Sequence, residues 1–209
     1  SISTRLADLT PVVIAALDNA AAALSEMAGL RIAVSSTTLG LARVADMPVL
    51  AGGPEAVALG VYFAFSGADD GQGHLLLLMD DAGSQQLAAL LLGEDAADVD
   101  VTASLPASAL AEAGNVSCSA FLNALGDTTG LRLDITPPAV VQDMRGAILD
   151  ALAADIATVA EEALVINTRF TLEQPEQLAH ALDLRFLVVP TPSMLEQLLE
   201  HAVPIGAVR

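Results

Sequence analysis

The chain has 209 residues, and its 26 Asp and Glu against 8 Lys and Arg give a net charge of −18. Such a charge disfavours binding to nucleic acid or to an anionic membrane surface, and it leaves general solubility or attraction to a basic partner as its role. The mean hydropathy is +0.59, but no uninterrupted apolar run reaches the roughly 18 to 20 residues of a transmembrane helix, so we expect no membrane insertion.

The first half is predicted to form a helix, several strands and a second helix. Its Ala-rich start is helical in character, and Thr10-Pro11 reads as the cap and first position of that helix. A strand-like stretch, VALGVYFAFSG, follows at residues 57–67, and HLLLLMDDAGSQQLAALLLG at 74–93 reads as a strand that runs into a helix. The segment GADDGQG, residues 67–73, is typical of a hairpin connection.

The second half repeats this order. AGLRIAVSSTTL, from Ala28, aligns with TGLRLDITPPAV, from Thr129, at an offset of 101 residues. ALVINTRFTL and LRFLVVPTPSMLEQLLEHA then match the later elements, and the second half is longer by about ten residues near RGAILDALAADIATVAEE. We predict a duplication with a boundary at residues 93–104, giving a degenerate repeat over about 1–98 and a second repeat over about 99–209 that carries the motif described below. Two units this short are expected to share one sheet and one core, as a single domain.

The helix predicted to be capped by Ser104 continues into a segment of mostly small and apolar residues, SALAEAGNVSCSAFLNALG. On a helical projection Ser108, Glu112 and Asn115 fall on one side, opposite an apolar side that contains Gly114. Glu112 and Asn115 are three residues apart and are therefore neighbours on the helix surface. Taken alone, three polar residues along one side of a helix are also typical of a helix face that is exposed to solvent.

A distant proline completes a specific spacing. Twenty-two residues separate Asn115 from Pro138, which gives Ser108-x3-Glu112-x2-Asn115-x22-Pro138. This pattern resembles the signature of the CheC-type chemotaxis phosphatases, the group of CheC, CheX and FliY: Asp or Ser, x3, Glu, x2, Asn, x22, Pro. EEALVINTRFTL is similar to a typical later strand of the family, and the length and duplicated layout are most similar to CheC.

The resemblance implies a CheC-like α/β fold, in which an extended, mainly antiparallel sheet carries two long pseudo-symmetric helices packed on one face. It implies an enzyme that dephosphorylates the aspartyl phosphate of a CheY-like response regulator, whose own receiver domain holds Mg²⁺. Asn115 would position the attacking water, and Glu112 would pair with a basic group of the receiver. Ser108 and Pro138 would support the site, although Pro138 also reads as an ordinary edge-strand proline. CheD is a further candidate partner.

The first half does not carry this signature. The offset of 101 residues places Pro11 opposite Glu112 and Ile14 opposite Asn115. We therefore expect a first half without catalysis, in which Ile14 is buried or covers a neighbour. The alternative function is a non-catalytic scaffold of the same fold, such as a CheD-binding or flagellar-switch protein. A small-molecule sensor is a third possibility, for which the sequence offers no pocket signature.

Other residues predict the compartment and the absence of a metal site. One cysteine, Cys118, excludes an internal disulfide and fits a reducing environment. The start SISTRLADLT lacks the basic region of a secretory signal, so a cytoplasmic protein is expected. The three histidines, His74, His180 and His201, show no metal-ligand spacing, and we expect the chain to have no metal or cofactor of its own.

Overall fold

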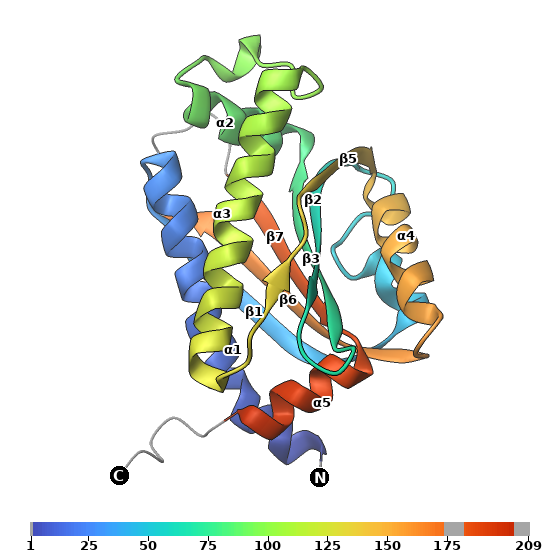
Figure 1. Ribbon diagram of the computed structural model, residues 1–209. Coiled ribbons are helices and arrows are strands. Elements are labelled where there is room, and N and C mark those ends of the chain that lie inside the picture. Colours follow the sequence, from blue (N-terminus) through green and yellow to red (C-terminus); the bar gives the residue numbers. More distant parts are fainter. Residues whose placement is uncertain (1, 174–181, 203–209) are drawn as a thin grey trace.

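A seven-stranded antiparallel sheet forms the centre of the structure, a computed structural model that describes residues 2–173 and 182–202 (Figure 1). The strands run in the order β1-β6-β7-β3-β2-β4, and β5 also pairs with β2. All pairs are antiparallel, so the expected fold class is confirmed. The strand bounds are β1 (Ile32–Arg43), β2 (Val57–Ser66), β3 (Gln72–Asp80), β4 (Asp134–Ile135), β5 (Ala139–Met144), β6 (Glu162–Leu172) and β7 (Asp183–Pro190).

The strand order has the symmetry that a duplication predicts. β1, β2 and β3 belong to the first half, and β5, β6 and β7 belong to the second. When β1 is exchanged with β5, β2 with β6 and β3 with β7, the order reads the same from the opposite edge of the sheet. The axis of this exchange lies between β3 and β7. The two halves therefore share one sheet, while the duplication itself and its boundaries stay a prediction.

The two long helices lie side by side on one face of the sheet, as expected (Figure 1). They are α1 (Ile2–Ala28) and α3 (Ser104–Thr129). The buried Ser117 hydroxyl of α3 donates a hydrogen bond to the Ala20 carbonyl of α1 over 3.1 Å, which fixes one helix against the other. Shorter helices lie at the ends of the sheet: α2 (Asp81–Leu92), the 3-10 turn η2 (Ala96–Asp98) and α5 (Pro192–His201).

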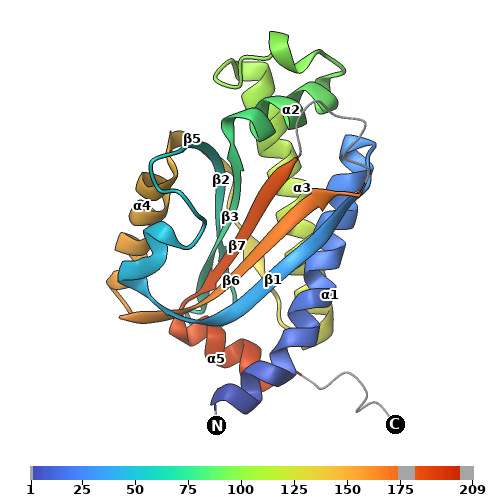
Figure 2. The ribbon, with the colours of Figure 1, turned by 180° about the vertical axis from the view of Figure 1, so that it is seen from behind.

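The opposite face of the sheet is covered by α4 (Arg145–Ala157) and the 3-10 helix η1 (Val44–Val49) (Figure 2). α4 occupies the segment in which the second half is longer than the first, and η1 stands at the corresponding place in the first half. Successive residues of a strand point to opposite faces. On β2, therefore, Val61 and Phe63 join the core under α1 and α3, whereas Ala58 and Tyr62 face α4.

Both long helices begin at positions that differ from the prediction. α1 begins at Ile2, and Pro11 lies inside it, so Thr10-Pro11 is not its start. The Thr10 hydroxyl donates to the Leu6 carbonyl over 2.8 Å. α3 has Ala103 as its N-cap, without a side-chain hydrogen bond, and Ser104 is its first helical residue; the predicted cap is therefore wrong by one position.

Both long helices end at matched positions of the two aligned segments. Gly29 and Gly130, which the offset of 101 residues matches, follow α1 and α3 with φ angles of 68° and 73°. This left-handed conformation suits glycine, which has no Cβ to clash with the preceding turn. The aligned GLR segments are therefore equivalent helix ends.

By length and composition, α1 is the one helix in the described part of the chain that could cross a membrane. Core helices of soluble proteins pass the same test. The apolar side of α1 lies in the main core, where Leu9, Leu17 and Leu24 are fully buried. Its hydrophobicity is thus accounted for by packing against α3 and the sheet.

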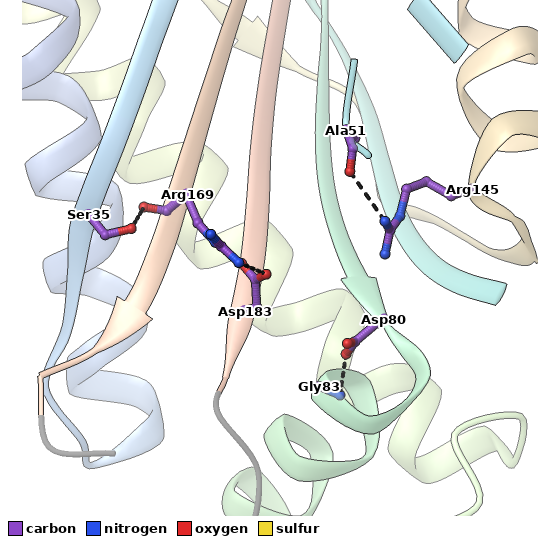
Figure 3. Close-up of polar contacts among 7 residues, drawn as sticks. All are labelled: Ser35, Ala51, Asp80, Gly83, Arg145, Arg169 and Asp183. Carbon is purple, nitrogen blue, oxygen red and sulfur yellow. Dashed lines mark hydrogen bonds and ion pairs between the residues drawn. The ribbon is translucent and has the colours of Figure 1, made fainter. Parts of the chain in front are cut away.

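A partly exposed ion pair joins the neighbouring strands β6 and β7 near one end of these strands (Figure 3). The Arg169 side chain on β6 donates two hydrogen bonds to the Asp183 carboxylate on β7, one of them from Nε to Oδ1 over 2.7 Å. These hydrogen bonds lower the pKa of Asp183, and the charges of Arg169, Arg185 and Arg145 act in the same direction. Burial opposes the shift.

Replacing Asp183 by asparagine should lower the free energy of unfolding by about 1 kcal/mol near neutral pH. Because the folded-state pKa of Asp183 lies below its ordinary value, its contribution exists above that value and is lost as pH falls below about 4. Urea unfolding of both proteins at about pH 7 and about pH 3 measures the difference at each pH. Asp134→Asn is the matched control, because its contact with Arg132 is 3.8 Å long and exposed; a penalty for Asp183→Asn that does not shrink at low pH would contradict this account.

Candidate functional site

The candidate site is built on α3, and Gly114 determines how closely that helix approaches the sheet. A Cβ added at Gly114 would stand 2.8 Å from Cγ1 and 3.1 Å from Cβ of Val61, and 3.3 Å from the ring of Phe63. The inner side of α3 is locked in place by this contact and by the buried Leu110, Cys118 and other apolar residues. The close neighbours are side chains of β2, rather than the backbone that a helical glycine often faces.

The predicted polar row lies on the outer side of α3. Ser108 and Glu112 are exposed, and Asn115 is partly exposed. Within residues 2–173 and 182–202, none of these three side chains has a hydrogen bond or ion pair. Glu112 and Asn115 are one turn apart, so an acceptor carboxylate and a carboxamide lie together where a docked molecule can reach both.

Pro138 lies on the sheet edge that flanks the same stretch of β2. Before it, the Thr136 backbone N–H donates to the Ala64 carbonyl over 2.9 Å, and after it Ala139 pairs with Tyr62. Pro138 therefore stands opposite Phe63, the residue on which Gly114 of α3 also rests. Proline has no N–H to donate, and it falls between β4 and β5, where the ladder on the sheet edge is interrupted. Two residues far apart in the sequence, Gly114 on α3 and Pro138 on the sheet edge, thus both lie beside Phe63 of β2.

The first-half counterpart of the site differs from the prediction in one respect. Ile14, which matches Asn115, keeps 43% of its surface exposed, so it is not buried, while the alternative expectation that it covers a neighbour stays a prediction. Pro11, which matches Glu112, is partly exposed on the same helix. The outer side of α1 thus places an apolar residue, with no polar atom in its side chain, where α3 has its carboxamide.

One exposed residue of the row was not singled out from the sequence. Leu105 lies three residues before Ser108, on the same side of α3, and 61% of its surface is exposed. A large apolar side chain beside three polar ones is typical of a contact surface for another protein. Its position at i−3 from Ser108 is the signal that could have indicated it.

The weaker candidates from the sequence do not join this site. Cys118 is buried on the inner side of α3, and burial raises the pKa of its thiol, as expected for a core cysteine. His74 lies on β3 and His201 at the end of α5, and His180 lies outside the described residues. In the described ranges no group of three or more His, Cys, Asp or Glu is placed to hold a metal ion.

Replacing Gly114 by alanine should destabilise the fold by about 1 to 3 kcal/mol. The new methyl would meet Val61, a short branched side chain that has little room to move. The higher helix propensity of alanine offsets only about 1 kcal/mol of the cost. Chemical denaturation measures the loss. Gly126→Ala is less suitable as a control, because its Cβ would meet a backbone carbonyl at 2.7 Å; Ser119→Ala, on the outer side of α3, is matched, and an equal loss there would refute the packing argument.

Comparison with known proteins confirms the resemblance to the CheC-type group. A model of the CheC-like family matches residues 105–141, the segment that contains all four residues of the spacing. The CheY-P phosphatase CheC of Bacillus subtilis is 29% identical over 119 residues, which make up 56% of this chain and 56% of that protein. The match thus spans little more than half of the curated relative.

Solved structures show that the fold is shared more widely. FliY of Thermotoga maritima has a TM-score of 0.64 at 19% identity, with 92% of each chain covered. A chain of the CheX-CheY-BeF3-Mg complex of Borrelia burgdorferi has a TM-score of 0.52 at 19% identity, with 84% of this chain and 95% of that chain covered. A chain of the FliG-FliM complex of H. pylori has a TM-score of 0.59 at 12% identity, with 94% and 98% covered. At these identities the likeness establishes the fold alone.

Proposed function

We propose that this CheC-like chain is a cytoplasmic phosphatase that hydrolyses the aspartyl phosphate of a CheY-like receiver domain. The observation that carries the proposal is the pair Glu112 and Asn115, held one turn apart on the outer side of a helix whose inner side is fixed to the sheet at Gly114. A site that must position one water molecule needs such a rigid support.

In this reaction the enzyme forms no covalent bond to the phosphoryl group. A water oxygen attacks phosphorus in line with the bond to the aspartate oxygen; that P–O bond breaks, the aspartate carboxylate leaves, and inorganic phosphate carries the new oxygen and releases a proton. The Asn115 carboxamide can accept a hydrogen bond from the water and donate one to a phosphoryl oxygen. It brings no negative charge near the phosphate, as a carboxylate would.

Glu112 has a different role in this proposal. As an exposed carboxylate on the same side of α3, it would pair with a basic group of the receiver and dock the helix over the phosphorylated aspartate. The receiver would supply Mg²⁺, which neutralises charge on the phosphoryl oxygens. The chain's net charge of −18 favours a partner whose contact surface is basic around the phosphate. Ser108 and Pro138 would support the contact, and CheD is a further proposed partner.

A second candidate function is a scaffold that binds a partner without hydrolysis. The fold neighbours include a chain of the FliG-FliM complex, and the first half has Ile14 and Pro11 at the positions that match Asn115 and Glu112. In that reading the outer sides of α1 and α3 form a contact surface only.

Phosphate release from a receiver charged with acetyl phosphate separates the two functions. If the proposal holds, adding this chain at catalytic amounts accelerates release over several turnovers. A chain that binds the phosphorylated receiver without accelerating release is a scaffold, and the phosphatase proposal then fails. CheY from the same organism is the substrate to use first.

A further inference from the structure

A cavity on the sheet face opposite α3 is not used by the proposed reaction. It has a volume of about 290 Å³ and lies between α4, the edge strand β5 and the neighbouring strands β2 and β3. Alanines on both sides, Ala139 of β5 and Ala147 and Ala151 of α4, leave this space because their side chains are short. Leu76 of β3 lies at its inner, apolar end.

The polar groups that line this cavity are hydrogen-bond acceptors. They are the hydroxyl of Tyr62 and the carboxylates of Asp143 and Asp155, and the described residues that line the cavity include no Lys, Arg or His. One Asp143 oxygen already accepts from the Met144 backbone N–H over 2.7 Å. The Asp155 carboxylate has no hydrogen-bond or ion-pair partner within the described part of the chain.

The Tyr62 hydroxyl also presents an acceptor to the cavity. Its oxygen lies 2.9 Å from Nδ1 of His74. Burial lowers the pKa of His74, and the charge of Asp155 offsets this only in part, so the imidazole is neutral near pH 7 and Nδ1 can accept. If Nδ1 is unprotonated, Tyr62 donates its only proton to His74; if Nδ1 carries the proton, it donates to the Tyr62 oxygen, which in either tautomer keeps a lone pair for a donor in the cavity.

We propose that this cavity binds a small organic cation, an apolar body with one primary ammonium group. The body would lie in the alanine-lined space between α4 and β5, which stays open to solvent on one side. The ammonium would donate to the Asp155 carboxylate and the Tyr62 oxygen, with the free Asp143 oxygen as a third acceptor. An anionic ligand would meet the two exposed carboxylates of Asp143 and Asp155, and a neutral ligand without donors would make no hydrogen bond to them or to the partly buried Tyr62 oxygen.

Binding of phenethylammonium to the full chain tests this proposal, with 2-phenylethanol as the neutral probe of the same shape. Titration followed by calorimetry in about 0.15 M salt reduces the general attraction of cations to a negatively charged protein. We expect saturable binding of the cation at one site, at least about tenfold tighter than the alcohol, because its hydrogen bonds to the carboxylates are charge-assisted.

Three variants locate the site. Ala151→Leu fills the cavity from an exposed position of α4 and should weaken cation binding about tenfold or more. Asp155→Asn should weaken it about tenfold, while leaving binding of the alcohol unchanged. Asp150→Asn is the matched control, because it removes the same charge from the same helix but does not line this cavity; its affinity should stay within about twofold of wild type.

The outcomes are distinct. Equal affinity for the cation and the alcohol, no saturable binding, or an Asp150→Asn variant as weak as Asp155→Asn would each overturn the proposal. The last result would indicate attraction by the overall charge. Thermal unfolding of each variant verifies that the fold is intact. Phosphatase activity is not part of the readout, so this test stands apart from that of the proposed reaction.

Discussion

Replacing Asn115 by alanine is expected to lower the rate of phosphate release by roughly a hundredfold or more, while affinity for the phosphorylated receiver changes little. The alanine methyl cannot orient water, but it leaves the surface of α3 otherwise unchanged. Asn115→Asp keeps the size of the side chain and adds a charge near the phosphoryl group, so it should be at least as inactive. The measurement is single-turnover dephosphorylation at saturating enzyme, which separates chemistry from binding.

Asn123→Ala is the matched control for this prediction. Asn123 is exposed on the same helix, about two turns further along, and its replacement should leave the rate unchanged. If Asn115→Ala and Asn115→Asp both retain the wild-type rate at saturating enzyme, Asn115 does not position the water.

Reversing the charge of Glu112, as Glu112→Lys, is expected to raise KM for the phosphorylated receiver by at least about tenfold, with a smaller change in kcat. A lysine would face the basic group of the receiver that Glu112 is proposed to pair with, and like charges in an interface cost several kcal/mol at most. The effect should be larger at low salt, because added salt screens an exposed pair. Steady-state kinetics at two salt concentrations provide the measurement.

Asp127→Lys is the control for Glu112→Lys, since it makes the same change of charge at an exposed position near the other end of α3. An equal rise in KM for both variants would show that overall charge, and not a contact at Glu112, controls docking. A fall in kcat with constant KM would contradict the docking role and assign Glu112 to the chemical step.

Most of the fold could be predicted from local patterns, and the failures have a common physical origin. The strands, the hairpin at GADDGQG and the helix ends at Gly29 and Gly130 follow from residues within each segment. The start of α1 does not. Pro11 inside a helix costs about 3 kcal/mol, but full burial of Leu9 offsets about 1.5 to 3 kcal/mol, and the partly buried Leu6 adds a smaller amount. α1 also contacts α5, which is distant in sequence.

Some features of the candidate site could likewise be predicted from the sequence, and others could not. The side of α3 that carries Glu112 and Asn115 could be predicted from helical periodicity, because the opposite side is apolar. The exposure of Ile14 could not be predicted, since apolar residues are common on protein surfaces and hydrophobicity alone does not place a residue inside. The place of Pro138 beside Phe63 depends on the pairing of β5 with β2, which no spacing within one segment reveals.

Each edge strand of the sheet pairs with a strand from the other half of the chain. This pairing affects how the protein can fold during synthesis. Ile32 of β1 pairs with Leu172 of β6, and Val57 of β2 pairs with Met144 of β5. Such contacts between residues far apart in the chain make a fold of high contact order, which forms slowly. While the ribosome is still making the second half, β1 has no partner, and its exposed backbone groups can pair with other chains. The first half, although it lacks the signature, therefore supplies strands that the sheet cannot be completed without.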